Sequence, residues 1–240
     1  REVFVMPYES GYTLIGATDT DYVGDINKVK ADSFEIEYLC DVVNTYFNKK
    51  ITPADVEWTY SGIRPILDDK GEGVAKIASD YVVEANDYQG GKIISIYGGK
   101  MSTYRKLAEE VSDKVCDMLE RPKGVAWTAN SELPGAEGYS LVFATFFKAF
   151  MRDYGWLPKA LATRYAISYG VRARDMLEGA KSEKDMGFYF GDGLYEREVS
   201  YLLEKEWAVT ADDILFRRTK LGLHLTPETV NNLERYLNTV

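Results

Sequence analysis

The sequence predicts an α+β fold in two parts: a first part with an antiparallel or mixed sheet, and a second part built only from helices. Three observations predict this fold class. Short β-type runs alternate with amphipathic helical segments in the first half of the chain. Pro and Gly accumulate between residues 121 and 138, as they do at domain boundaries. Beyond that stretch the apolar residues recur at helical spacing. We therefore expect one domain at residues 1–132 and a helical domain at residues 133–240.

The expected strands of the first part are short. Residues 2–6 and 12–15 are β-rich, and the hairpin turn between them ends at Gly11, which can adopt a positive φ. Residues 81–85 and 93–97 form a second strand pair around a turn at residues 89–91. A further β-type run covers residues 56–60.

Helices are expected where apolar residues follow helical spacing behind an N-cap residue. In the first part, Asp32 and Glu35 resemble a capping box that opens a helix reaching Phe47, and Thr52 before Pro53 opens only a short turn. A longer helix is expected at residues 102–119. In the second part the expected helices are residues 139–154, 159–169, 171–177, 194–207, 211–219 and 227–237. The cap signals there are Thr210 with Asp213, and Thr226 before Pro227.

Composition and charge exclude several classes of protein. The formal net charge of −9 gives no overall attraction for nucleic acid. The single histidine, His224, is interpreted as structural; it leaves too few ligands for most zinc sites, and we expect no metal. Cys40 and Cys116 lack CxxC spacing and are expected to be buried thiols of a reducing compartment. No apolar run reaches the roughly 18 residues of a membrane span, and a chain that begins at Arg1 without Met resembles a fragment.

The first motif that could carry chemistry is Gly98-Gly99-Lys100, between an expected strand and an expected helix. Two glycines let a ligand approach the backbone closely, and both the helix N-terminus and Lys100 supply positive charge. This combination suits a group that is or becomes anionic, such as a phosphate or a reduced flavin ring. The alternative is a plain strand-to-helix turn with an exposed lysine.

The second motif, Ser61-Gly62-Ile63-Arg64-Pro65, places one arginine at the end of a β-type run. The planar guanidinium of arginine makes two parallel charge-assisted hydrogen bonds to a phosphate. The alternative is a surface Arg64 paired with Asp68 or Asp69.

Two further motifs have both a structural and a functional interpretation. Gly16-Ala17-Thr18-Asp19 would pack closely against a ligand or another domain, or Asp19 would cap a turn. The basic run from Arg217 to Lys220 would complement a helix dipole, with Gly222 as the C-cap, or would meet an anionic membrane surface or a partner subunit.

Taken in order, these motifs resemble the FAD-dependent (aerobic) glycerol-3-phosphate dehydrogenases, and the resemblance covers essentially the whole chain. Its most specific pieces are the block from Gly98 to Glu109 and the Arg217-Arg218-Thr219-Lys220 block. Phe4-Val5-Met6-Pro7, Leu133-Pro134-Gly135, Tyr195-Glu196-Arg197-Glu198, Glu206-Trp207 and Asp212-Asp213-Ile214-Leu215 also match.

The resemblance implies that residues 1–132 are part of a substrate-binding domain with a flavin-facing turn and that residues 133–240 are an all-α C-terminal cap. The family's GxGxxG turn is missing, so FAD would be bound mainly by an N-terminal domain outside this chain. Arg64 and Lys100 would be the catalytic and substrate-binding residues. Gly98, Gly99, Lys100 and Thr103 would contact the cofactor.

The resemblance also implies an activity and partners. Members oxidise sn-glycerol 3-phosphate to dihydroxyacetone phosphate, with hydride transfer to FAD and electron transfer to quinone. The alternatives are a glycerol-3-phosphate oxidase that uses oxygen and, for the second half, a non-catalytic module for dimerisation or membrane docking. We expect a cytoplasmic protein, and the alternative location is a peripheral position on the cytoplasmic face of the membrane. A homodimer is a candidate for the oligomeric state.

One position departs from the family pattern. The family commonly has an arginine before Asp-Tyr, expected to help bind phosphate, whereas this chain has Ser79-Asp80-Tyr81. Losing one charge-assisted bond costs about 1.5–3 kcal/mol, or roughly one to two decades in affinity. Another cation would have to compensate, or the substrate differs.

Overall fold

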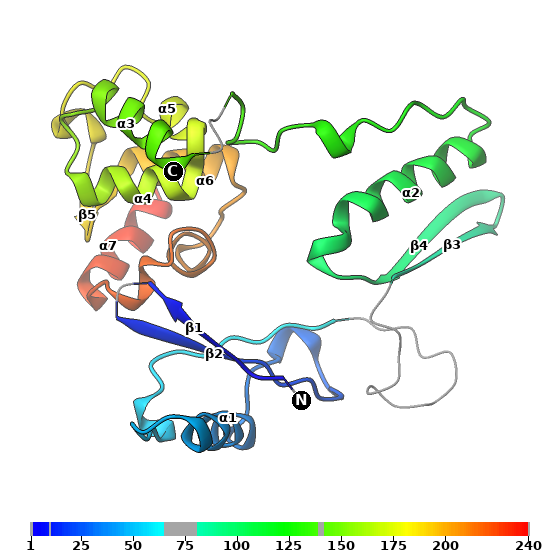
Figure 1. The fold of residues 1–240 in the computed structure, drawn as a ribbon, viewed down its shortest axis with the longest axis horizontal. Helices are drawn as coiled ribbons and strands as arrows, with labels where there is room; N and C mark the ends of the chain where they lie inside the picture. Colours follow the sequence, from blue (N-terminus) through cyan, green and yellow to red (C-terminus); the bar gives the residue numbers. More distant parts are fainter. Residues whose placement is uncertain (1, 10, 65–80, 139–141, 240) are drawn as a thin grey trace. The chain divides into compact units, whose positions relative to one another are not determined.

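The computed structural model describes residues 2–9, 11–64, 81–138 and 142–239. The chain divides into two compact units, Arg1–Ser131 and Glu132–Val240 (Figure 1). The first unit contains two antiparallel hairpins and two long helices, and the second consists mainly of helices. The predicted α+β fold class is therefore confirmed.

The first hairpin joins β1 (Phe4–Tyr8) to β2 (Tyr12–Gly16) with five paired positions. Its turn contains Gly11 at a φ of 94°. Pro7 lies inside β1 opposite Thr13, not beyond the strand end as expected. A two-stranded sheet has only edge strands, and an edge strand tolerates a residue without an N–H donor.

The helix α1 (Ser33–Tyr46) follows the loop after β2. Asp32 and Glu35 form the predicted capping box: the Asp32 carboxylate accepts the Glu35 N–H at 2.8 Å, and the Glu35 carboxylate accepts the Asp32 N–H at 3.2 Å. Its buried positions are Cys40 and Val43. A short 3-10 turn, η2 (Pro53–Asp55), follows where Thr52 and Pro53 predicted one.

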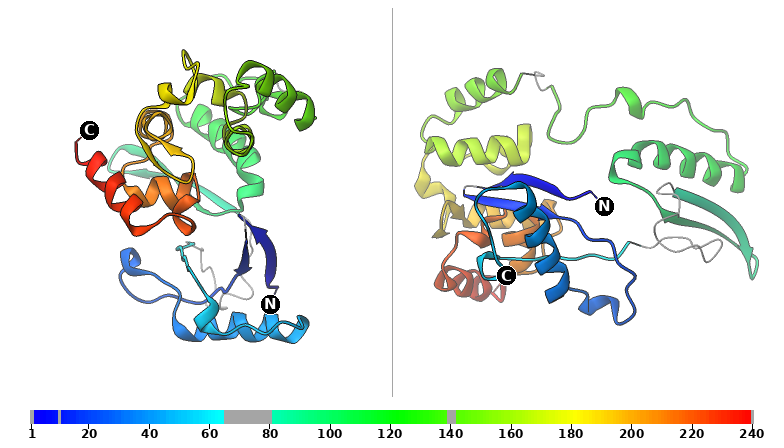
Figure 2. Two further views of the ribbon diagram at one scale, coloured as in Figure 1. Left: turned by 90° about the vertical axis from the view of Figure 1, so that its left-hand side faces the viewer. Right: turned by 60° about the horizontal axis from the view of Figure 1, so that its bottom comes forward.

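The second hairpin, β3 (Tyr81–Tyr88) with β4 (Gly91–Gly98), is longer than expected because the ladder runs through Asn86 and Asp87 up to the turn. Gln89 and Gly90 both have positive φ, at 50° and 82°, which fits the right-handed twist of a tight hairpin. The helix α2 (Tyr104–Met118) packs along this hairpin (Figures 1 and 2). The Lys114 ammonium donates to the Val83 carbonyl at 3.0 Å.

The predicted strand at residues 56–60 is wrong, because none of these residues belongs to a strand. The β propensity of Val56, Trp58 and Tyr60 favours extended backbone, but a strand also needs a ladder partner. Whether a partner exists is decided by the surrounding chain and not by the run itself.

The second unit contains most of the described core. Its α-helices are α3 (Phe143–Asp153), α4 (Lys159–Tyr169), α5 (Ala173–Met176), α6 (Glu196–Lys205) and α7 (Pro227–Leu237). The fully buried side chains are Phe150, Ala162, Tyr165, Ala173, Leu177, Met186, Leu194, Glu198, Val199, Leu202, Ile214 and Leu233. By contrast, the described residues of the first unit bury only Cys40 and Val43 among the hydrophobic side chains.

The expectation that residues 133–240 contain only helices is corrected in one place. A small hairpin joins β5 (Tyr189–Gly191) to β6 (Leu194–Tyr195), through Asp192 and Gly193 at φ values of 43° and 80°. Leu194 and Tyr195 were expected to begin a helix because they continue the apolar spacing of α6. The Tyr195 N-cap has extended backbone, so α6 begins only at Glu196.

The region expected as a helix at residues 211–219 contains a π-helix, η7 (Asp213–Arg218). The predicted cap is present: the Thr210 hydroxyl accepts the Asp213 N–H at 3.1 Å, and the Asp213 carboxylate accepts the Thr210 N–H at 2.9 Å. Gly222 is not the predicted C-cap, because Lys220 takes the left-handed conformation at a φ of 59°. A Cβ at Gly222 would overlap the Phe216 ring, so this glycine makes room for a side chain.

Candidate functional site

The turn from β4 into α2 contains the Gly-Gly-Lys motif. Gly98 and Gly99 have φ values of 73° and 98°, which residues with a Cβ rarely adopt. A Cβ at Gly99 would meet Tyr81 at 3.5 Å, an ordinary contact, so the backbone angle and not the space requires glycine there. Gly98 is paired with Tyr81 at the end of the β3–β4 ladder, so these angles occur where the chain leaves the hairpin.

Lys100 and Thr103 complete this turn. The Thr103 hydroxyl donates to the Lys100 carbonyl at 2.9 Å and accepts the Lys100 N–H at 3.3 Å. Thr103 thus holds the backbone of the 3-10 turn η3 (Met101–Thr103) that leads into α2. The Lys100 residue is exposed, and 91% of Met101 is exposed. The turn therefore exposes a cation directly after two residues without side chains.

The helix behind this turn is fixed by a charged cluster. The Glu109 carboxylate accepts from Arg105 at 2.8 Å, from Lys106 at 3.0 Å and from the Thr128 hydroxyl. The Thr128 hydrogen bond, followed by that of Lys106, lowers the pKa of Glu109 below its ordinary value. Because Thr128 belongs to η4 (Thr128–Asn130), this cluster ties the end of the first unit back onto α2.

Arg64 forms an ion pair with Asp19, a partner that the sequence analysis did not predict. Its Nη2 donates to Asp19 Oδ2 at 2.7 Å, with 52% of the Arg64 side chain and 54% of the Asp19 side chain exposed. Asp68 and Asp69, the expected partners, lie outside the described residues. The sequence interpretation of Asp19 as a turn cap missed this pair. The available signal was its position directly behind a strand in a run of small residues.

The structure brings four of the predicted site residues together and leaves one apart. Gly98, Gly99, Lys100 and Thr103 share the β4–α2 turn. Among the described residues, no hydrogen bond or ion pair joins Arg64 to that turn. Residues 65–80, which follow Arg64 in the sequence and include Ser79, lie outside the described residues. That Arg64 and Lys100 share one pocket therefore stays a prediction.

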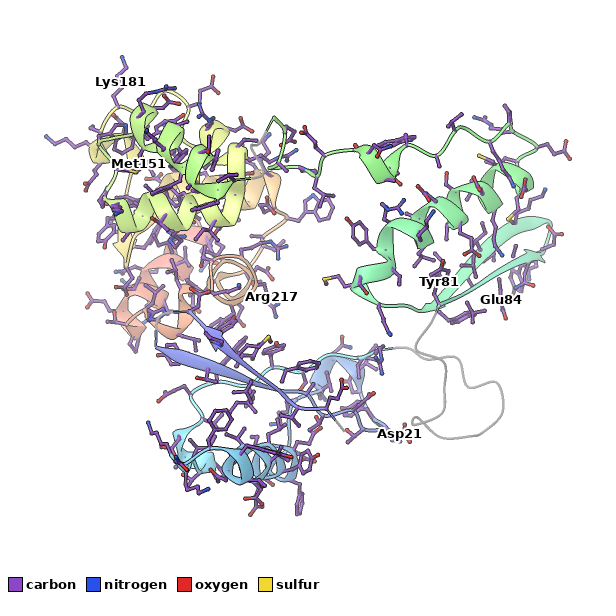
Figure 3. All side chains as sticks on the ribbon, in the orientation of Figure 1. Asp21, Tyr81, Glu84, Met151, Lys181 and Arg217 are labelled. Carbon is purple, nitrogen blue, oxygen red and sulfur yellow. The ribbon has the colours of Figure 1, made fainter. Side chains whose placement is uncertain are left out.

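The basic run of the second unit has contacts within its own unit. Arg217 pairs with Asp213 at 2.9 Å, and Arg218 Nε donates to the Glu206 carbonyl at 2.9 Å. Hydrogen bonds from the backbone N–H groups of Thr210 and Val209, in that order, lower the pKa of Asp213 to about 2. Arg217 is labelled in Figure 3, and 59% of its side chain is exposed.

The described part of the chain was searched for groups of metal ligands and for cysteine pairs. No group of three or more His, Cys, Asp or Glu side chains is placed to hold a metal ion among those residues. Both cysteines are free; Cys40 is buried, which raises the pKa of its thiol, and Cys116 is half-buried. None of the described helices combines the length and apolar character that crossing a membrane requires.

Comparison with known families defines the class of protein. Residues 1–105 match the family described as FAD dependent oxidoreductase. Residues 126–240 match the C-terminal domain of alpha-glycerophosphate oxidase. The chain therefore belongs to the FAD-dependent oxidoreductases, in the branch that carries this C-terminal domain.

The relatives narrow this class. The chain is 41% identical to the glycerol-3-phosphate dehydrogenase of Pseudomonas aeruginosa, over 99% of this chain and 46% of that protein. It is 39% identical to the aerobic glycerol-3-phosphate dehydrogenase of Escherichia coli, over 99% of this chain and 47% of that protein. It is also 39% identical to D-erythritol 1-phosphate dehydrogenase of Brucella abortus, over 94% of this chain and 45% of that protein. The resemblance to FAD-dependent glycerol-3-phosphate dehydrogenases is thereby confirmed, and the chain spans about half the length of the curated relatives it matches.

FAD is the cofactor of the matched family, and the β4–α2 turn fits it. The pair Gly98-Gly99 offers backbone without side chains, which a flat ring can approach closely. Lys100 is exposed beside this backbone and adds a positive charge at the beginning of a 15-residue helix. A cation there would stabilise negative charge on a bound group.

Proposed function

We propose that the protein containing this chain oxidises sn-glycerol 3-phosphate to dihydroxyacetone phosphate with FAD as its cofactor. Two of the relatives above are named glycerol-3-phosphate dehydrogenases and match nearly the whole chain. When bound, FAD supplies the acceptor for the hydride that leaves C2 of the substrate. The observation that carries the proposal is the exposed Lys100 beside the Gly98-Gly99 backbone.

Each of the two cations has a separate role in this proposal. Arg64 binds the phosphate or the C2 oxygen of the substrate, because half of its side chain is exposed and a guanidinium can grip two oxygens at once. Lys100 holds negative charge that develops on the cofactor or the substrate. Gly98, Gly99 and Thr103 keep the backbone in the conformation that exposes Lys100.

A second candidate substrate is D-erythritol 1-phosphate. The relative named for it is as similar to this chain as the Escherichia coli enzyme. Both substrates are polyol monophosphates, so one anion-binding site would accept either phosphate. Ser79, where the family commonly has arginine, is the position in the sequence that favours testing a substrate of different length.

The test is steady-state oxidation of both polyol phosphates by the complete FAD-loaded protein, with an artificial dye as electron acceptor. We expect turnover of glycerol 3-phosphate, and a rise of about tenfold or more in its KM for Arg64→Ala, because a charge-assisted contact to phosphate is lost. Arg152→Ala is the matched control, since 78% of the Arg152 side chain is exposed in the other unit. Wild-type protein that oxidises neither substrate would refute the proposed activity. An Arg64→Ala variant with KM within twofold of wild type would remove Arg64 from the site.

The proposed electron acceptor is quinone, as the similarity to the aerobic dehydrogenase favours. The alternative acceptor is oxygen, favoured by the match to the oxidase C-terminal domain. Hydrogen peroxide formed in proportion to substrate would assign the oxidase reaction. Reduction of a soluble quinone without peroxide supports the dehydrogenase.

The proposed location is the cytoplasm, at the cytoplasmic face of the membrane where quinone is reached, and the proposed assembly is a homodimer. An exposed apolar pair in the second unit supports a docking role: 87% of Trp207 and 76% of Val209 are exposed. Co-sedimentation of the complete protein with anionic vesicles tests the membrane contact, with Trp207→Ala as the variant. Sedimentation equilibrium tests the dimer, and a strictly monomeric, lipid-indifferent protein would contradict both.

A further inference from the structure

We propose that Asp19 is a positioning residue for Arg64: its carboxylate holds one nitrogen of the guanidinium so that the remaining N–H groups face the substrate phosphate. The proposal rests on the proposed function, in which Arg64 binds that phosphate. Asp19 itself touches neither substrate nor cofactor in this proposal.

The contact leaves most of the guanidinium available. Only the Arg64 Nη2 to Asp19 Oδ2 hydrogen bond, at 2.7 Å, is formed between the two side chains. A guanidinium carries five N–H donors in a fixed plane. About half of each side chain is exposed. The proposal therefore places the phosphate on N–H groups of Arg64 other than the one bonded to Asp19, where two of them would bind two phosphate oxygens.

The loop that carries Asp19 is itself anchored. Thr18 and Thr20, on either side of it, donate their hydroxyls to Glu35 Oε1 at 2.5 and 3.4 Å. Glu35 is fixed in turn by the capping box at the start of α1. The residues before and after Asp19 are thus both hydrogen-bonded to the start of α1. A carboxylate held in this way can orient a long, flexible arginine side chain.

Folding stability does not account for the pair. Ion pairs between exposed side chains contribute little to stability, because solvent screens them and two long side chains lose freedom. This pair joins residues 45 positions apart in the sequence. The pair includes the arginine that is proposed to bind substrate, and this favours a role for the pair in the site.

The sign of one kinetic effect separates positioning from simple electrostatics. The negative charge of Asp19 repels a phosphate, so if charge alone mattered, removing Asp19 would lower the KM. Positioning predicts the opposite, because a free Arg64 spends less time in the productive orientation. We expect Asp19→Ala to raise the KM for glycerol 3-phosphate by about fivefold with kcat within about twofold, in the complete FAD-loaded protein.

A double-mutant cycle shows whether the effect acts through Arg64. In the Arg64→Ala background, Asp19→Ala should change the KM by less than about twofold. Asp19→Asn should recover most of the loss, since an amide oxygen still accepts from Nη2. Asp21→Ala is the matched control: Asp21 lies on the same loop (Figure 3), and the described residues give it no ion pair. A KM that falls or stays unchanged in Asp19→Ala, or an undiminished effect in the Arg64→Ala background, would overturn the proposal.

A second measurement decides the outcome without turnover. Phenylglyoxal condenses with two nitrogens of a guanidinium, and in the wild type the hydrogen bond to Asp19 occupies Nη2 of Arg64. Peptide mapping of the complete protein should therefore show Arg64 modified several times faster in Asp19→Ala than in wild type. If neither polyol phosphate is oxidised, the proposed function fails while this rate still reports on the pair. An unchanged rate would refute the positioning role, whatever the protein oxidises.

Discussion

Replacing Glu198 with glutamine should destabilise the second unit more than any exposed substitution. Glu198 lies on α6 and is fully buried. Its two oxygens accept from Arg164 Nη1 at 2.6 Å and Nη2 at 2.7 Å, and the Tyr169 hydroxyl donates to it at 2.6 Å. Burial, followed by the charge of Glu198, raises the pKa of Tyr169 far above its ordinary range, so that hydroxyl stays a donor.

The magnitude follows from these contacts. Breaking a buried ion pair by removing one charge costs about 3–5 kcal/mol, mainly because the other charge is left uncompensated. Arg164 keeps its hydrogen bond to the Gly193 carbonyl at 2.8 Å, and 18% of its side chain is exposed. Both features place the loss at the lower end, at about 3 kcal/mol. For a unit of this size, that corresponds to a fall in Tm of roughly 12 °C.

Calorimetry and urea denaturation of the Glu198→Gln chain measure this loss. Glu204→Gln is the matched control, because Glu204 lies on the same helix and is exposed; it should change the free energy of unfolding by less than about 0.5 kcal/mol. Replacing both partners, as in Arg164→Met with Glu198→Leu, should recover much of the stability. A loss below about 1 kcal/mol for Glu198→Gln would refute the assignment of this pair as a buried, mutually compensated charge.

Three further perturbations test other parts of the chain. Lys100→Met should weaken FAD retention or lower the flavin reduction potential of the complete protein, with Lys106→Met unchanged; normal flavin content and potential would contradict this role. The pKa of Asp213 is lowered to about 2 in the folded protein. The ionised Asp213 carboxylate therefore stabilises the fold fully above pH about 4, and this stabilisation is lost as the pH falls toward 2. Urea denaturation should thus separate wild type from Asp213→Asn at pH 7 and much less at pH 2.5. Gly222→Ala should cost about 1–3 kcal/mol, because the added Cβ overlaps the Phe216 ring; a neutral effect would show that the ring moves freely.

Local signals in the sequence were sufficient wherever a short stretch carried its own structure. The helix α4 covers Lys159–Tyr169, the range that the apolar spacing predicted. The caps at Asp32, Thr210 and Thr226 form because each uses a side chain and an N–H group three residues apart. Such contacts need no information from the rest of the chain.

Signals that depend on a distant partner were not sufficient. Residues 56–60 have the composition of a strand without belonging to one. The β5–β6 hairpin was hidden because Leu194 and Tyr195 also fit the spacing of the helix that follows. Gly222 has no unusual φ, so only the position of the Phe216 ring explains it.

The sequence by itself determined the family, the two-part α+β architecture and the chemistry available to the site, because motif order, periodicity and residue type are all local properties. Only the tertiary structure decided which side chain holds which cation. Arg64 pairs with Asp19, which is 45 positions away in the sequence, and Glu198 pairs with Arg164, which is 34 positions away. Such pairs form only when the intervening chain folds so that the two side chains lie close together. A buried carboxylate also needs a partner that compensates its lost hydration, and the spacing of residues along the sequence does not predict which cation will be near enough.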